Sequence, residues 1–291
     1  METVTAADGR RLSVQLFGDP DGVPIFLLHG TPGSRLGPRP RGVVLHRLGV
    51  RLIAFDRPGY GRSDRLAGRQ VADVAADVAA IADRYRLTRF AVVGRSGGGP
   101  HALACAAMLP ERTTRAAVLV GLAPHGADGL DWFDGMSTSN VIDFTAAAAG
   151  HDPIAARLTA AAESIRADPA SLIARLQAEL PDADRRVVAD SGIRSMLVRN
   201  FAEALRASPA GWIDDVLAFC SPWGFDPAAI AVPVLLWHGE GDVFSPASHA
   251  RWLADRIPGA QVLVQPGAAH FGALDVLADI LRWLAAGTPR D

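Results

Sequence analysis

Short apolar runs of β-forming residues alternate with helical stretches along most of the chain, and this alternation constrains the fold more than any other feature. Most runs are continuously apolar, as in strands buried on both faces of a parallel sheet. The runs occupy residues 11–18, 24–30, 51–56, 89–94, 116–122, 232–239 and 260–265, and helical periodicity marks 71–87, 100–112 and 274–286. Asp8-Gly9 predicts an additional edge hairpin. The expected fold is therefore α/β, a doubly wound, mostly parallel eight-stranded sheet.

The alternation stops after residue 124, and no strand pattern returns until Val232. A gap of this length is too long for a simple connection between two strands. Segments 153–167 and 169–180 have the periodicity of amphipathic helices. We therefore expect a core domain made of residues 1–124 and 231–291, with an inserted helical cap at 125–230.

The composition excludes several classes of protein. All 29 basic residues are arginine, which removes lysine Schiff-base chemistry and the lysine of an ATP-binding loop. The net charge is -2 and the arginines are scattered, so a nucleic-acid partner is not expected. We expect a small-molecule substrate and neither cofactor, metal nor membrane partner. The oligomeric state cannot be predicted from the sequence.

The two cysteines, Cys105 and Cys220, are far apart and lack CxxC spacing, which argues against both a disulfide framework and a cysteine-rich zinc site. No apolar run reaches the roughly 18 residues of a membrane span. The N-terminal residues do not resemble a secretion signal. These features predict a cytoplasmic protein.

The segment Gly94-Arg95-Ser96-Gly97-Gly98 follows a predicted strand and precedes a predicted helix. A serine on such a sharp turn occupies strained backbone geometry, so the residues two before and two after it must be glycine. The turn holds the hydroxyl at a helix N-terminus, where the backbone N–H of Gly97 can face a developing oxyanion. We interpret Ser96 as the nucleophile rather than as part of a phosphate-binding loop.

Four further segments complete a pattern: residues 29–33 (HGTPG), 56–63 (DRPGYGRS), 238–242 (HGEGD) and 267–271 (GAAHF). With the serine turn, they resemble the α/β-hydrolase superfamily over nearly the whole chain. The resemblance implies that Thr31 supplies the second oxyanion N–H, that Asp242 is the catalytic acid and that His270 is the catalytic histidine. The segment 56–63 would be structural.

The chemistry requires the same parts. A serine hydroxyl is a weak nucleophile until a base takes its proton, and the imidazole base needs a carboxylate to fix its tautomer. The order Ser96, Asp242, His270 is the one that this fold uses. Glu240, or Asp128 and Asp131 in an earlier loop, remain alternative acids.

Three other histidines have structural interpretations. His29 and His238 precede glycines at strand ends, where we expect them to make structural hydrogen bonds. His101 lies one turn into the helix after Ser96 and is expected to be buried or to face the cap.

The residues that contact substrate are less clearly marked. Arg95 either binds a substrate carboxylate or pairs with an acidic neighbour, and the sequence leaves both open. Aromatic side chains are natural walls for an apolar acyl or alcohol group. The residues expected in this role are Trp132, Phe133, Phe144, Trp212, Phe219 and Phe271.

These patterns predict a serine hydrolase that cleaves a small carboxylic ester, thioester or lactone through an acyl-enzyme. Relatives on this fold instead perform carbon–carbon bond hydrolysis, cofactor-free oxygenation or cyclisation, and these remain alternatives. A proline-iminopeptidase-like activity is another, because residues 125–230 hold 15 acidic and 8 basic residues, which could attract an amine. A ligand receptor on the same scaffold is disfavoured because every catalytic part is present.

Overall fold

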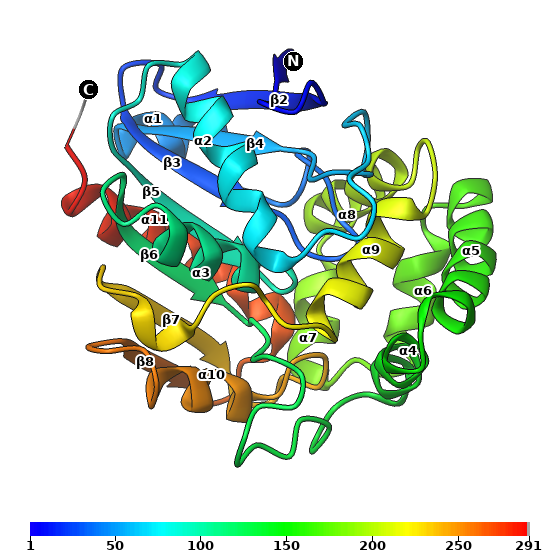
Figure 1. Ribbon diagram of the computed structural model, residues 1–291. Coiled ribbons are helices and arrows are strands. Elements are labelled where there is room, and N and C mark those ends of the chain that lie inside the picture. The colour runs from blue at the N-terminus through cyan, green and yellow to red at the C-terminus, as the bar shows by residue number, and fades with distance from the viewer. Residues whose placement is uncertain (290–291) are drawn as a thin grey trace.

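The apolar runs of the sequence form the strands of a single sheet in the computed structural model, which describes residues 1–289 (Figure 1). Its strand order is β1-β2-β4-β3-β5-β6-β7-β8. β1 and β2 pair antiparallel, as do β2 and β4, and all other neighbours are parallel. The strands are β1 (Glu2–Thr5), β2 (Arg11–Gly18), β3 (Val23–Leu28), β4 (Val50–Phe55), β5 (Phe90–Arg95), β6 (Thr113–Leu119), β7 (Val234–Gly239) and β8 (Gln261–Gln265). The predicted fold class is confirmed.

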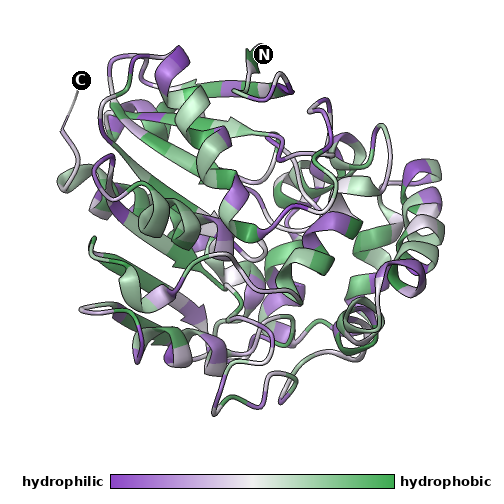
Figure 2. Ribbon diagram, in the orientation of Figure 1, coloured by the Kyte–Doolittle hydropathy of each residue, from purple (hydrophilic) through white to green (hydrophobic). Residues whose placement is uncertain are grey.

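The sheet is covered by helices on both faces, which explains its continuously apolar central strands. In β3, Phe26 and Leu28 face one buried cluster, whereas Ile25 and Leu27 face the other. The first cluster includes the apolar sides of η1 (Val71–Asp73), α2 (Val74–Arg84), α3 (Gly98–Met108) and α10 (Ala247–Ala254). The second includes those of α1 (Gly42–Arg47) and α11 (Ala273–Ala286). Figure 2 shows the resulting hydrophobic centre of the sheet.

The chain between β6 and β7 forms a separate group of helices at one end of the sheet (Figure 1). They are α4 (Thr138–Ala148), α5 (His151–Ala167), α6 (Ser171–Gln177), α7 (Asp182–Ala189), α8 (Ser191–Ala204) and α9 (Ala210–Phe219). The short η2 (Pro227–Ala229) follows them and packs against α3. α5 and α6 correspond to the two segments with predicted helical periodicity. Buried side chains of these helices continue the sheet's first cluster, so this group, here called the cap, shares a core with the sheet.

Some boundaries differ from those that the sequence predicts. β6 begins three residues earlier than expected, at Thr113, and ends before Val120, whose φ of +49° leaves the extended region. α1 and α10 were not predicted because each spans only 6 or 8 residues, too short for a clear period. Residues 290 and 291, the end of the predicted core segment 231–291, lie outside the described residues.

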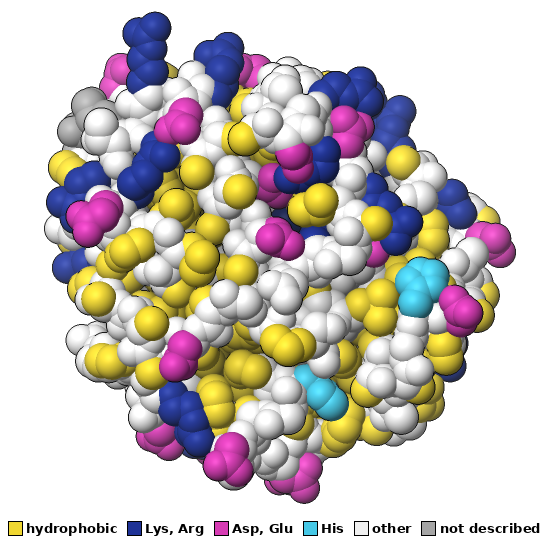
Figure 3. Space-filling model, viewed as in Figure 1, with side chains coloured by type: hydrophobic (Ala, Val, Ile, Leu, Met, Phe, Trp, Pro, Cys, Tyr) yellow, Lys and Arg dark blue, Asp and Glu magenta, His cyan; other side chains and the backbone are white. Residues whose placement is uncertain are grey.

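Within residues 1–289, no helix is both long and apolar enough to cross a membrane. Arginine and acidic side chains are interspersed over the face shown in Figure 3.

Candidate active site

Ser96 lies on a tight turn between β5 and α3. Its backbone φ is +54°, a left-handed conformation that residues other than glycine seldom adopt. A Cβ atom added to Gly94 would overlap the carbonyl oxygen of Gly98, and one added to Gly98 would overlap that of Leu28. The turn therefore requires glycine on both sides of Ser96, which lines a cavity.

Asp242 and His270 form a buried pair on the loops that follow β7 and β8. His270 Nδ1 lies 2.9 Å from Asp242 Oδ2. The other carboxylate oxygen accepts the backbone N–H groups of Phe244 and Ser245 at 2.8 and 3.1 Å. Burial alone would raise the pKa of Asp242, but the charges and hydrogen bonds of His270 and His238 hold it well below its usual range. An ionised carboxylate thus fixes the His270 ring.

The alternative acids lie elsewhere. Glu240, Asp128 and Asp131 are exposed, and no hydrogen bond or ion pair of the described residues joins them to His270. Ser96 and His270 line the same cavity. No hydrogen bond joins their side chains in the described part of the chain, and such catalytic contacts commonly tighten when substrate binds.

The loop that carries His270 is held by a residue of the cap that sequence reasoning missed. Asp184, on α7, accepts the backbone N–H of His270 at 3.1 Å and that of Phe271 at 2.7 Å. Asp184 is fully buried, and burial raises the pKa of its carboxyl against the opposing influence of His270. No local motif marks this contact, because 86 residues separate Asp184 from His270.

Thr31 and Gly97 lie against each other next to Ser96. A Cβ atom added to Gly97 would overlap the Thr31 side chain and lie 3.1 Å from the ring of Phe219. Within the described residues, neither the Thr31 nor the Gly97 backbone N–H donates to another protein group. Two unengaged N–H groups beside a serine are what stabilisation of an oxyanion requires.

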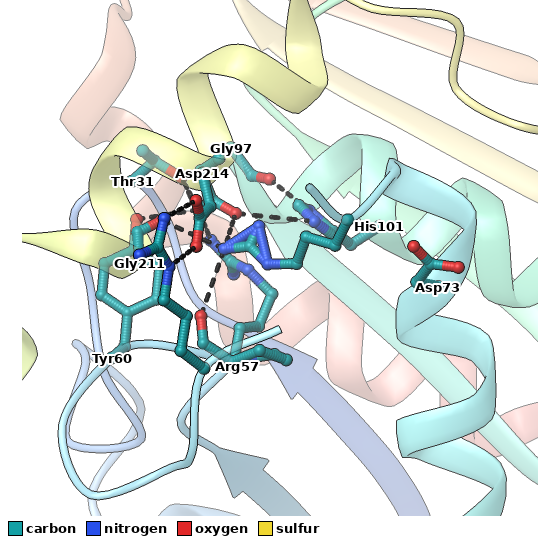
Figure 4. Close-up of polar contacts among 12 residues, drawn as sticks. Thr31, Arg57, Tyr60, Asp73, Gly97, His101, Gly211 and Asp214 are labelled. Carbon is teal, nitrogen blue, oxygen red and sulfur yellow. Dashed lines mark hydrogen bonds and ion pairs between the residues drawn. The ribbon is translucent and has the colours of Figure 1, made fainter. Parts of the chain in front are cut away.

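A buried cluster of charged groups lies next to this loop, around Asp215 of α9. Asp215 accepts hydrogen bonds from Thr31 Oγ1 at 2.6 Å and Tyr60 Oη at 2.8 Å. Arg57 also donates to this carboxylate, and Arg69 Nη2 lies 2.8 Å from Oδ1. Burial would raise the pKa of Asp215, but the two guanidinium charges hold it well below its usual range. Figure 4 shows Thr31, Arg57 and Tyr60 gathered beside Gly97.

Two histidines complete this cluster, which we call the Asp215 cluster: Asp215, Thr31, Arg57, Tyr60, Arg69, His29 and His101. His101 Nδ1 lies 2.8 Å from the Gly97 carbonyl oxygen (Figure 4), and His29 Nε2 accepts the Arg57 backbone N–H at 3.1 Å. Burial lowers the pKa of both rings, that of His101 to about 3. Both are therefore neutral side chains that fix the geometry around Gly97 and Thr31.

A cavity of about 390 Å³ lies between the carboxyl ends of the strands and cap helices α4, α6, α8 and α9. Five of the predicted substrate-contacting residues line it: Arg95, Phe144, Trp212, Phe219 and Phe271. Sequence reasoning missed most of the remaining apolar wall, because aliphatic residues of cap helices carry no local signal of pocket lining. These residues are Leu172, Leu176, Leu197 and Val216, and Leu122, Phe201 and Phe244 complete the wall.

Trp132 and Phe133, which the sequence predicts to contact substrate, are not among the residues that line this cavity. The Trp132 indole N–H donates to the Ala123 carbonyl oxygen at 2.9 Å, and its ring packs edge-on against Phe144 and Phe133. Trp132 and Phe133 thus form the core of the segment that connects β6 to α4.

Arg95, immediately before Ser96, lines the cavity with only 9% of its surface exposed. The acidic neighbour that the sequence allowed is absent: in the described part of the chain, the Arg95 guanidinium makes no hydrogen bond or ion pair. Burial is the only influence that shifts the pKa of its guanidinium, lowering it to about 10. The group is therefore positively charged and uncompensated at neutral pH.

No group of three or more His, Cys, Asp or Glu side chains in residues 1–289 is arranged to hold a metal ion.

The fold and site define a doubly wound α/β protein with its cavity at the carboxyl ends of the strands. A model of the alpha/beta hydrolase fold family matches residues 23–275, and the chain belongs to this family. This membership, together with relatives named as esterases, supports a hydrolase.

Two curated relatives match about two fifths of the chain. A non-heme chloroperoxidase of Streptomyces lividans is 37% identical over 126 residues, 43% of this chain and 45% of the relative. A proline iminopeptidase of Xylella fastidiosa is 35% identical over 130 residues, 43% of this chain and 41% of the relative. The matched part is thus less than half the length of either relative. An esterase structure from Rhodococcus sp. ECU1013 shares the fold, with TM-score 0.68, 22% identity and 99% coverage of both chains.

Proposed function

We propose that this chain is a serine hydrolase that cleaves a small-molecule carboxylic ester, thioester or lactone. Ser96 Oγ attacks the carbonyl carbon while His270 takes the hydroxyl proton, and Asp242 stabilises the imidazolium that forms. The backbone N–H groups of Thr31 and Gly97 stabilise the oxyanion. His270 then donates the proton to the leaving group, and water, activated by His270, hydrolyses the acyl-enzyme and frees Ser96.

One observation carries this proposal. The 2.9 Å contact between His270 and Asp242 lies beside the cavity into which the strained turn presents Ser96. An imidazole oriented by a buried carboxylate is the base that a serine nucleophile needs.

The cavity supports a small substrate with an apolar portion. Its volume of about 390 Å³ is within the range of small-molecule sites, and its walls are mostly aliphatic and aromatic. The walls that the cap supplies, Phe144, Trp212 and Phe219 among them, would select the length or ring size of the acyl or alcohol group.

An aminopeptidase is the second candidate, because Asp143 and Glu179 line the cavity and one relative is a proline iminopeptidase. Both carboxylates already have partners, however. Asp143 accepts from Arg157 Nε at 2.9 Å, and Glu179 accepts the Ser139 backbone N–H at 3.0 Å. An ammonium group would also be repelled by the unpaired Arg95 beside Ser96. An ester is therefore the better substrate for this site.

Labelling with a fluorophosphonate probe, followed by peptide mass spectrometry, tests the nucleophile. We expect the probe on Ser96 in the wild type and no labelling of Ser96→Ala. Ser139→Ala is the matched control, since Ser139 lines the same cavity but its hydroxyl bonds to Glu179. Labelling that persists in Ser96→Ala would refute the proposal.

A substrate panel then separates the reaction classes. We expect turnover of p-nitrophenyl esters from acetate to octanoate, and no turnover of proline β-naphthylamide. Ser96-dependent cleavage of the amide without any cleavage of the esters would instead identify an aminopeptidase.

A further inference from the structure

The Arg95 guanidinium is the feature of the cavity that the proposed mechanism does not use. It belongs to the residue before the nucleophile, is nine-tenths buried and has no partner in the described part of the chain. Its nitrogens are not fully sealed from solvent, and Arg95 also lines a second, smaller cavity beside His29, Ser34 and Arg35. A buried charge in this state has lost its hydration without gaining a counter-ion.

Gly30 lines the cavity next to both Arg95 and Ser96. A Cβ atom built on Gly30 would lie 3.4 Å from Ser96 Cβ and 3.9 Å from Arg95 Nη2. Gly30 thus lies beside both the nucleophile and the guanidinium.

The other charged groups that line the cavity do not neutralise Arg95. Asp143 is paired with Arg157, Glu179 accepts hydrogen bonds from Ser139, and Arg175 is a second cation on the exposed side of the cap. Nothing else in the cavity wall can serve as the counter-ion, so the ligand itself must supply the negative charge.

We propose that Arg95 binds a free carboxylate carried by the substrate, so that the preferred substrate is an ester, thioester or lactone with a second, anionic carboxyl group. This inference rests on the proposed hydrolase function and narrows its substrate class. A guanidinium offers a carboxylate two parallel N–H donors, and such charge-assisted bonds are strongest where water is excluded. The anion would thereby fix the scissile carbonyl over Ser96.

Two substrates that differ only in a terminal carboxylate test the proposed carboxylate subsite at Arg95. Mono-p-nitrophenyl glutarate and p-nitrophenyl valerate have the same acyl chain length and differ in the terminal carboxylate. We expect wild-type kcat/KM to be about 10- to 100-fold higher for the glutarate ester, as for a hydrogen bond to a charged group. In Arg95→Met this preference should disappear, because kcat/KM for the glutarate ester falls more than that for the valerate ester.

Arg175→Met is the matched control, because it removes a cation that lines the same cavity at an exposed position. We expect the preference for the glutarate ester to stay within about threefold of wild type. A wild type that prefers the valerate ester, or an Arg95→Met that loses activity on both esters alike, would overturn the subsite.

A binding measurement separates failure of this subsite from failure of the hydrolase proposal. In Ser96→Ala, which needs no turnover, glutarate should raise the melting temperature and glutaramide should not. Ser96→Ala with Arg95→Met should lose the glutarate effect, and Ser96→Ala with Arg95→Lys should retain part of it. An equal effect of glutarate with and without Arg95 would refute the subsite, whereas absent Ser96 labelling would refute only the hydrolase.

Discussion

Two buried arginines near Ser96, Arg57 and Arg95, have opposite surroundings. Arg57 donates to the His29 carbonyl oxygen and to the Asp215 carboxylate, and Thr31 Oγ1 lies 3.1 Å from its Nη2. Arg95 is nearly as buried, but its guanidinium bonds to no described residue. The guanidinium of Arg57 thus has a carboxylate and carbonyl partners in the Asp215 cluster, whereas that of Arg95 has no protein partner in the cavity.

The charged groups of the Asp215 cluster stabilise the structure around the site, whereas the charge of Arg95 is available to a ligand. Burying an ion costs several kcal/mol, which the Asp215 cluster offsets through its own ion pairs and hydrogen bonds. Arg95 has no such compensation, so its desolvation is offset only when an anion binds. Substitutions in the Asp215 cluster should therefore lower stability, and substitutions in the cavity should change activity.

Ser96→Ala should show the largest effect, and on activity alone. Loss of the nucleophile is expected to lower kcat by about 10⁴-fold or more, roughly 5 kcal/mol in the activation barrier. The melting temperature should stay near that of wild type, because the hydroxyl faces the cavity. Steady-state kinetics with a p-nitrophenyl ester and a thermal melt check both parts, and near-normal turnover would exclude this nucleophile.

Asp215→Ala should show the largest effect on stability. Removing this carboxylate leaves Arg57 and Arg69 buried without a counter-ion, which we expect to cost about 3–5 kcal/mol in the free energy of unfolding. Asp214→Ala is the control, because its partner Arg65 has a side chain that is 44% exposed and stays hydrated. We expect a loss of about 1 kcal/mol or less there. If urea unfolding showed equal losses in the free energy of unfolding for both variants, Asp215 would contribute no more to stability than Asp214.

Phe219→Ala and Trp132→Ala should separate the cavity wall from the core beside it. Phe219 lines the cavity, so its truncation should shift the preference for acyl chain length by about 1–3 kcal/mol in kcat/KM. Trp132→Ala should lower stability and leave that preference unchanged, because its ring packs within the β6–α4 connection. An unchanged chain-length profile in Phe219→Ala would argue against the cavity as the substrate site.

Arg95→Met and Arg57→Met compare the two arginines directly. Arg95→Met should have the smallest effect on the free energy of unfolding. Arg95→Met removes an uncompensated buried charge, so its free energy of unfolding should equal or exceed that of wild type. Arg57→Met should lose about 3–5 kcal/mol, because Asp215 loses a buried partner. If urea unfolding showed Arg95→Met to be as unstable as Arg57→Met, Arg95 would be part of the scaffold.

The parts of this molecule that local sequence specifies could be predicted from the sequence. Continuous apolar runs indicate strands such as β3 and β5, and the glycines around Ser96 follow from the steric demands of one turn. Asp242 and His270 were recognisable because each lies in a short glycine-rich loop after a strand.

Contacts between distant segments could not be predicted. Asp184 and Asp215 lie in the cap and hold loops of the sheet domain, yet nothing in their flanking residues marks those partners. Residue type alone does not show whether an aromatic side chain lines the cavity, as Phe219 does, or lies in the core, as Trp132 does. The role of Arg95 depends on the absence of an acidic neighbour in space, which only the fold reveals.

Trapping the acyl-enzyme tests the central claim most directly. The wild type would be mixed with mono-p-nitrophenyl glutarate, quenched with acid during the initial burst and digested for mass spectrometry. We predict a glutaryl adduct on the peptide that contains Ser96, and no adduct or turnover in Ser96→Ala. Hydrolysis of this ester without an adduct, or with the adduct on another residue, would contradict the account.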